Sequence, residues 1–93
     1  MTTKEKLEDE SKKFSKQLLG KTIVSKTGKR FGDVGDLIFE TRSGELIHMV
    51  VNNPTAYTEK LELEKDKQGR ILIPFSAVIA MGDFMVIAEE DIV

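Results

Sequence analysis

Three four-residue segments of this sequence share one turn pattern, and they divide the chain into short runs. The segments are Ser25–Gly28, Thr41–Gly44 and Asp66–Gly69. Each begins with a side-chain oxygen that can accept a local backbone hydrogen bond, and each ends with glycine, which adopts the left-handed conformation without steric cost. This order is typical of a type I turn followed by a bulge, a common connection between antiparallel strands. We therefore expect a hairpin around each segment, with positive φ at its glycine.

The runs between these turns are short and rich in β-branched and aromatic residues, which is typical of a small all-β barrel or sandwich. A fourth and tighter hairpin is expected where Gly82-Asp83 joins VIAM to FMVI, with a type II′ turn. The expected strands are Lys21–Ser25, Arg30–Thr41, Glu45–Asn52, Lys60–Lys65, Arg70–Pro74, Val78–Met81 and Phe84–Ala88. No helical period longer than one turn is evident outside Ser76–Ala80.

Gly32 and Gly35 lie inside one expected strand, FGDVGDLIFET. Glycine weakens a strand unless the strand bends or bulges there, and a small barrel needs such corners to close. The spacing of these glycines after Gly28 does not fit a phosphate-binding loop. Asp33 and Asp36 follow the two glycines, and we interpret them as acceptors for exposed backbone amides, because two carboxylates offer too few oxygen ligands for a metal.

Residues 1–17 have a different composition from the rest of the chain. They carry five Lys and four Asp or Glu, with few apolar residues. If these residues form a helix, its few apolar side chains make only a narrow stripe that stabilises the helix little. Isolated helices of this length are also marginal in water. We expect a helical or disordered lead-in over 1–17 and one folded domain over 18–93.

The residue types that carry chemistry are sparse. The chain has no cysteine, which excludes disulfides, thiolate nucleophiles and zinc–thiolate sites. The single histidine, His48, has no second histidine beside it, and Ser76 has no base to activate it. Glu62 and Glu64 alternate with leucines, as on the solvent face of a strand. We expect no catalytic residue, no cofactor and no metal.

The charge pattern argues against nucleic acid and membranes as partners. The formal net charge is −2, and residues 18–93 hold nine Lys or Arg against twelve Asp or Glu. The basic residues fall in separate turns, and Phe31, Phe39 and Phe84 occupy core-like positions rather than a stacking surface. No apolar run approaches 18 residues, and the N-terminus is too charged for a signal peptide. We expect a soluble cytoplasmic protein without direct nucleic-acid binding or membrane insertion.

Three expected strands are apolar on both faces: Leu46–Val51, Val78–Met81 and Phe84–Ile87. Only one face of each can line a small barrel, so we expect a second copy to cover the other in a homodimer that buries roughly 1,200–2,000 Å². The alternative is that residues 75–81 fold back over the barrel. The candidate contact residues for a partner or for the dimer are Met49, Tyr57, Met81 and Met85. Tyr57, in the irregular stretch TAYTEK, either makes such a contact or caps a barrel end.

Two stretches of the sequence carry a family resemblance. The first is LLGK at 18–21, followed by Val24, Gly28 and FGDV at 31–34. The second is ILIP at 71–74, followed by Ala77-Val78 and the Gly82-Asp83 turn. Together they resemble a PRC-barrel domain over residues 18–89.

This resemblance implies a fold and a class of function. The family includes the cytoplasmic domain of the photosynthetic reaction-centre H subunit, the C-terminal half of the ribosome maturation factor RimM, and free-standing archaeal proteins. Some of the archaeal proteins are linked to cell division through the adaptor SepF, and this chain resembles the free-standing type most. The resemblance implies a small β-barrel that binds other macromolecules without catalysing a reaction. Together with the two-sided apolar strands, we therefore expect a small antiparallel β-barrel that serves as a non-enzymatic, self-associating protein adaptor in a SepF-linked division complex. The alternative is a factor in ribosome maturation or RNA processing that resembles RimM.

Overall fold

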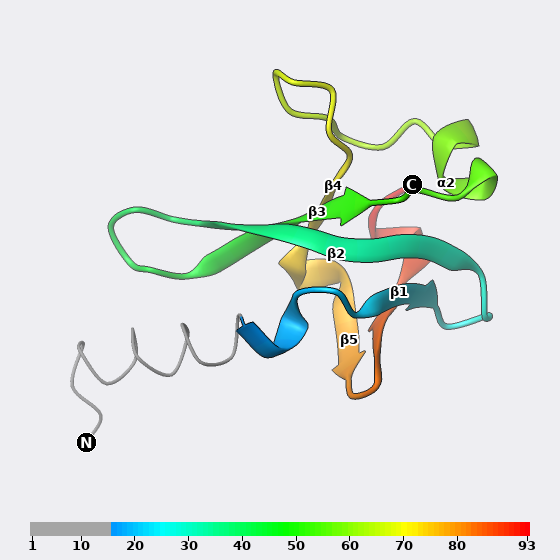
Figure 1. Ribbon diagram of the computed structural model, residues 1–93, viewed down its shortest axis with the longest axis horizontal. Helices are drawn as coiled ribbons and strands as arrows, with labels where there is room; N and C mark the ends of the chain where they lie inside the picture. The colour runs from blue at the N-terminus through cyan, green and yellow to red at the C-terminus, as the bar shows by residue number, and fades with distance from the viewer. Residues whose placement is uncertain (1–15) are drawn as a thin grey trace.

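A computed structural model describes residues 16–93, and these residues form β-strands with only short helices between them (Figure 1). The predicted lead-in lies almost wholly outside the described residues, so its helical or disordered character stays a prediction. The elements are β1 Thr22–Ser25, β2 Arg30–Phe39, β3 Leu46–Asn52, α2 Ala56–Lys60, β4 Leu72–Pro74, η1 Phe75–Ala77, β5 Val78–Met81, β6 Phe84–Ile87 and η2 Glu89–Asp91. The predicted all-β fold class is confirmed, since the described residues are mostly β and their helices are short.

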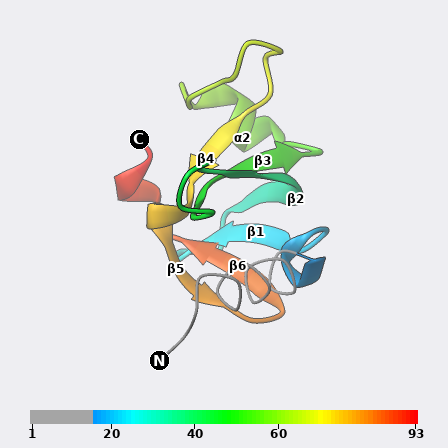
Figure 2. The same ribbon diagram turned by 90° about the vertical axis from the view of Figure 1, so that its left-hand side faces the viewer.

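The strands form one sheet in the order β4-β3-β2-β1-β6-β5. Neighbouring strands are antiparallel except β1 and β6, which run parallel, so the sheet is mixed rather than wholly antiparallel. The single-turn 3₁₀ helix η1 leads directly from β4 to β5, the two outermost strands, and Figure 2 shows the sheet curling between them. This curl gives the sheet its barrel shape.

The glycine-ended turns form as predicted, with φ of 91° at Gly28, 72° at Gly44 and 81° at Gly69. In the first, the Gly28 amide donates to the Ser25 carbonyl at 3.0 Å, and the Ser25 amide donates to the Lys29 carbonyl at 2.9 Å. The Lys29 amide also donates to the Ser25 hydroxyl at 3.1 Å. The turn that ends at Gly69 has the same closing bonds, so a local pattern of four residues specifies both turns.

The middle turn differs from the prediction in its first residue. Here the Gly44 amide donates to the Glu40 carbonyl at 2.9 Å. The Glu40 carboxylate, not the Thr41 hydroxyl, accepts from the amides of Arg42 and Ser43. These bonds hold the pKa of Glu40 below its ordinary value, with the Ser43 amide as the largest contributor.

The type II′ turn predicted at Gly82 is wrong. Such a turn needs positive φ at its first central residue, and Gly82 is not among the glycines with positive φ. The reason is the register, since Met81 pairs with Met85 and the connection is therefore longer than two residues. A β-carbon at Gly82 would meet no atom within 4 Å, so glycine is not sterically required there.

Gly32 and Gly35 both lie at bulges of β2, as predicted. The β2–β3 register shifts between Val34 and Asp36, and the β1–β2 register shifts where Gly32 faces Ile23. At Gly32 φ is 145°, and an added β-carbon would come within 2.7 Å of the Asn52 carbonyl oxygen. These close approaches let β2 bend across the sheet.

The strand predicted at Lys60–Lys65 is wrong, and the helix α2 just before it was not predicted. The Thr55 hydroxyl accepts from the Thr58 amide and so caps the first turn of α2, which ends at Lys60. The following residues make only an isolated bridge, Lys65 to Ile71. The alternation of leucine and glutamate over residues 61–64 therefore predicted which side chains are exposed. It did not predict whether this segment pairs with a strand.

The core combines side chains from most of the elements. Phe31, Ile23, Met49, Ile73, Met85 and Ile87 are almost fully buried, together with Leu18 before β1 and Ala77 in η1. Phe31 is buried as its predicted core-like position requires, whereas Phe84 is 53% exposed and Phe39 is half-buried. Of the helices described between residues 16 and 93, none is both long and apolar enough to cross a membrane.

Candidate functional site

The outer side of β5, β6 and β1 carries an apolar surface that the core does not use. Met85 and Ile87 of β6 point inward and have 0% exposure, so Phe84 and Val86 must point to the opposite face of the sheet. The register places Val86 between Val24 of β1 and Ala80 of β5. We call these four residues, Val24, Ala80, Phe84 and Val86, the outer apolar face.

Phe84 is the most prominent member of the outer apolar face. It is 53% exposed, and its neighbour in the register on β1 is the half-buried Thr22. Beyond β1 the same rows continue into Asp33 and Arg30 of β2, which are polar. The apolar surface therefore has a charged border along one side, an arrangement that resembles the apolar centre and polar rim of protein interfaces.

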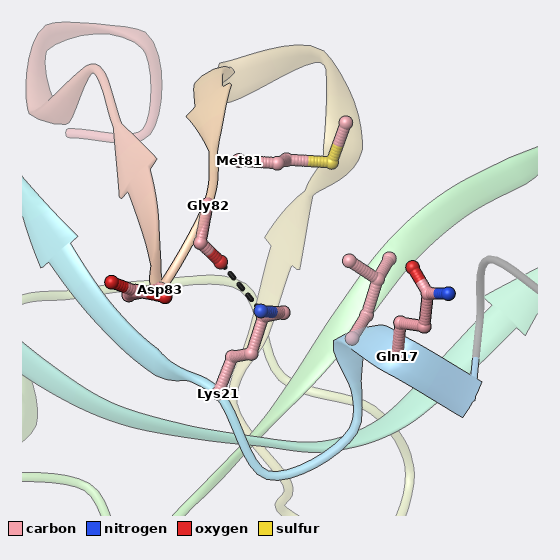
Figure 3. A pocket seen from close by; sticks show the side chains of 6 residues that line it. Gln17, Lys21, Met81, Gly82 and Asp83 are labelled. Atoms are coloured by element: carbon pink, nitrogen blue, oxygen red, sulfur yellow. Dashed lines mark hydrogen bonds between the residues drawn. The ribbon is translucent and has the colours of Figure 1, made fainter.

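A shallow hollow of about 300 Å³ lies beside the β5–β6 connection. It is lined by Gln17, Leu18, Lys21, Met81, Gly82 and Asp83. Figure 3 shows Lys21 reaching toward Gly82, whose carbonyl accepts a hydrogen bond from the Lys21 ammonium. The hollow thus offers an ammonium, a carboxylate, an amide and a thioether, groups suited to contact with a polypeptide.

The structure separates the three methionines that the sequence grouped as candidate contacts. Met81 is 43% exposed at the edge of the sheet, as a contact residue must be. Met49 and Met85 have 0% exposure, so their prediction as contacts is wrong. The sequence leaves the direction of these two side chains open, because both faces of β3 and β6 are apolar and only the pairing of the strands decides which face meets the core.

Of the strands that are apolar on both faces, only some leave their second face exposed within the described chain. On β3 the second face is covered, since Val50 is only 5% exposed beside Leu72 of β4. Residues 75–81 do not fold back over the outer face as the alternative required. Instead β5 extends the sheet beside β6, and Ile79 remains 52% exposed.

Tyr57 caps one end of the barrel rather than standing free. Its ring packs edge-on against Phe31, with the centroids 5.7 Å apart and the planes at 90°. The Lys29 ammonium lies 5.5 Å from the ring centroid, and the hydroxyl donates to the Glu89 carboxylate. That hydrogen bond raises the pKa of Tyr57. Of the two roles considered for Tyr57, the end cap is the one that these contacts support.

Three of the remaining polar candidates, His48, Asp33 and Asp36, have partners within the chain, whereas Ser76 does not cap the helix that contains it. The His48 Nε2 lies 3.3 Å from a Glu64 carboxylate oxygen. Asp36 accepts from the Leu37 amide at 2.8 Å, as its predicted role requires, whereas Asp33 contacts side chains, namely Thr22, Asn53 and Arg30. Ser76 is exposed, and η1 has no side-chain cap. Within residues 16–93 no group of three or more His, Cys, Asp or Glu is placed to hold a metal ion.

Comparison with known proteins agrees with this architecture. Residues 10–91 match the PRC-barrel domain family. The chain is also similar to Uncharacterized protein MJ1118 of Methanocaldococcus jannaschii, with 27% identity over 78 residues that cover 84% of this chain and 83% of that protein. The glycine turns, the curled six-stranded sheet and the bulged β2 are consistent with this match. Since the family match spans most of the sequence, this chain belongs to the PRC-barrel domain family.

Proposed function

We propose that this protein is a non-enzymatic adaptor that binds a protein partner through the outer apolar face and also self-associates. The observation that carries the proposal is Phe84, a large aromatic side chain that is 53% exposed on a sheet face with apolar neighbours. Aromatic side chains at the centre of an apolar patch are the residues that most often dominate binding energy. The hollow beside Met81 extends this surface toward Lys21 and Asp83.

The polar residues support an adaptor rather than an enzyme because they are engaged in the fold. His48 contacts Glu64, Tyr57 donates to Glu89, and Asp66 accepts from the amides of its own turn. A catalytic group needs a free face and a substrate within hydrogen-bond reach. These side chains instead fix turns and ends of the barrel.

The setting that we propose is a cell-division complex in which the partner is SepF. Support comes from the resemblance to free-standing archaeal members of the family and from the similarity to a protein of an archaeon. Ribosome maturation, the role of the related RimM, is the alternative setting. The net charge of −2 favours a protein partner over RNA in either setting.

Affinity capture from the native host with the intact chain tests this proposal. We expect SepF to be recovered with the unmodified chain and to fall by about tenfold or more with Phe84→Glu, because a charge would be buried in the interface. Ile47→Glu is the matched control, since Ile47 is 37% exposed on β3, away from the outer apolar face. Equal recovery of SepF with all three chains would contradict the assigned surface. Recovery of ribosomal proteins or rRNA in its place would support the alternative setting.

A further inference from the structure

We propose that β5 pairs with β5 of a second copy, antiparallel and about a two-fold axis, so that one sheet runs through two protomers. This inference deepens the self-association in the proposed function and rests on it. It names the strand, the direction of pairing and the number of copies.

The edge at β5 is open within the described part of the chain. β5 stands last in the strand order and pairs only with β6. Its sequence, Val-Ile-Ala-Met, has neither a charge nor a proline, and Ile79 and Met81 are 52% and 43% exposed. Natural sheets usually protect such an edge with lysine, proline or a covering segment, because its free main-chain groups are a template for another strand.

The opposite edge, at β4, is closed by the chain itself. The Leu72 amide donates to the Glu64 carbonyl at 2.8 Å, and Lys65 forms a bridge with Ile71. Pro74 at the end of β4 has no amide hydrogen to donate. A β5 strand therefore finds no β4 edge to pair with on the next molecule. Head-to-tail growth is blocked, and the remaining self-pairing is β5 with β5, which closes at a dimer.

The charge pattern favours a second copy as the occupant of this edge. Residues 71–82 contain no charged side chain, although the molecule as a whole has a net charge of −2. Two copies can thus bring their β5 edges together without placing like charges in contact, which they could not do across the acidic C-terminal residues 89–91. A strongly charged peptide would find no opposite charge on this uncharged strand.

The size of the contact predicts a weak and reversible dimer. A four-residue strand is about 13 Å long at about 3.3 Å per residue. Such an edge, with the Ile79 and Met81 side chains of both copies, reaches the small end of specific interfaces, near or below about 1,200 Å² in total. We therefore expect a Kd on the order of 1–100 μM. This dimer is weaker than one that buries the whole second face of the apolar strands, as the sequence alone suggested.

The absence of cysteine from the sequence makes the strand pairing directly testable. Single cysteines are placed in the full chain at each β5 position in turn, and at Ile47 and Phe84 as controls. Antiparallel partners lie about 4.5–5.5 Å apart between Cα atoms, within disulfide range. We expect one β5 position, the one nearest the two-fold axis, to form an intermolecular disulfide about tenfold or more faster than the Ile47→Cys variant under mild oxidation.

Sedimentation equilibrium of the cysteine-free full chain accompanies the cross-linking. We expect a monomer–dimer equilibrium, and about a tenfold or larger increase in Kd for Ile79→Lys, because the two-fold axis brings the new charges close together. Ile47→Lys should leave the Kd unchanged. Circular dichroism checks that both variants fold, which their exposed positions permit.

Each outcome bears on a different part of the inference. A dimer that cross-links through Phe84→Cys instead of a β5 position overturns the edge pairing and leaves self-association standing. Masses above the dimer overturn the closure argument. A monomer at every concentration overturns both the pairing and the self-association, while the adaptor role is still decided separately by capture of SepF.

Discussion

The two edges of this sheet, β4 and β5, are built from similar apolar residues, but only the β4 edge is covered by another segment of the described chain. β4 reads Leu-Ile-Pro and β5 reads Val-Ile-Ala-Met. The segment between α2 and β4 returns along the β4 edge and satisfies part of its main chain, whereas no described strand does so for β5. The difference shows that edge protection here comes mainly from a neighbouring segment, and that Pro74 is the one contribution of the strand sequence itself.

Protection of β4 depends on three local devices in sequence. The Thr55 cap starts α2, which ends at Lys60 and directs the chain along the sheet. Leu63, 8% exposed, then anchors the covering segment in the core. The Asp66–Gly69 turn finally reverses the chain into β4. Each device can be removed by one substitution, which makes the contrast between the edges experimentally accessible.

Removal of the Leu63 anchor should have the largest effect. Leu63→Ala deletes a core side chain, and we expect the free energy of unfolding to fall by about 2–4 kcal/mol in urea titration. With the cover loosened, the β4 edge becomes available, so sedimentation should also show masses above the dimer. Glu62→Ala, at an exposed position in the same segment, is the control and should change stability by less than about 0.5 kcal/mol. A stability loss as small as that of the control would mean that Leu63 does not anchor the cover.

Replacement of the turn glycine should have a smaller effect. Gly69 has φ of 81° and no atom within 4 Å of an added β-carbon, so the cost of Gly69→Ala is conformational strain alone. We expect a loss of about 1–2 kcal/mol in the free energy of unfolding. Gly82→Ala is the matched control, because Gly82 is equally uncrowded and lacks positive φ. Equal losses at the two positions would contradict the assignment of strain to Gly69.

The carboxylate of the same turn should give the smallest effect, visible as a pH dependence. Partial desolvation raises the pKa of Asp66, but hydrogen bonds from the amides of Arg70 and Gln68 and from the Arg70 side chain outweigh it and lower the pKa. Since the folded pKa lies below the unfolded value of about 3.9, the stabilisation is present above that value and is lost as the pH falls through the folded pKa.

Thermal unfolding between neutral pH and about pH 3 measures this effect. We expect Asp66→Asn to lower the midpoint at neutral pH and to flatten its acid decline, because the variant has no carboxylate to protonate. Asp83→Asn, at an exposed position on the other hairpin, should leave the profile unchanged. An Asp66→Asn profile parallel to that of the unmodified chain would show that this carboxylate does not stabilise the turn.

The parts of the fold that could be predicted from sequence are those with local causes. Ser25–Gly28 and Asp66–Gly69 form the expected turns because their hydrogen bonds involve only neighbouring residues. Gly32 and Gly35 could be assigned to bends because a strand rarely contains glycine without one. The start of α2 could also have been predicted, since Thr55 is a residue type that caps helices and Glu59 supplies an acidic side chain in the first turn.

The parts that could not be predicted depend on contacts between distant segments. The inward direction of Met49 and Met85 is set by how β3 and β6 pair with their neighbours, and strands that are apolar on both faces leave that pairing open in the sequence. The covering role of residues 61–65 is set by where α2 ends and by the Lys65–Ile71 bridge. The exposure of Phe84 follows from the parallel pairing of β1 with β6, two strands from opposite ends of the chain.

Residue-specific hydrogen exchange across a range of protein concentrations tests the contrast between the edges most directly. We predict that the Leu72 amide, bonded to Glu64, is protected equally at all concentrations. The outward-facing amides of Val78–Met81 should exchange rapidly in dilute protein and become protected as the dimer forms. Protection in β5 that does not change with concentration, whether high or absent throughout, would contradict an open edge that a second copy closes.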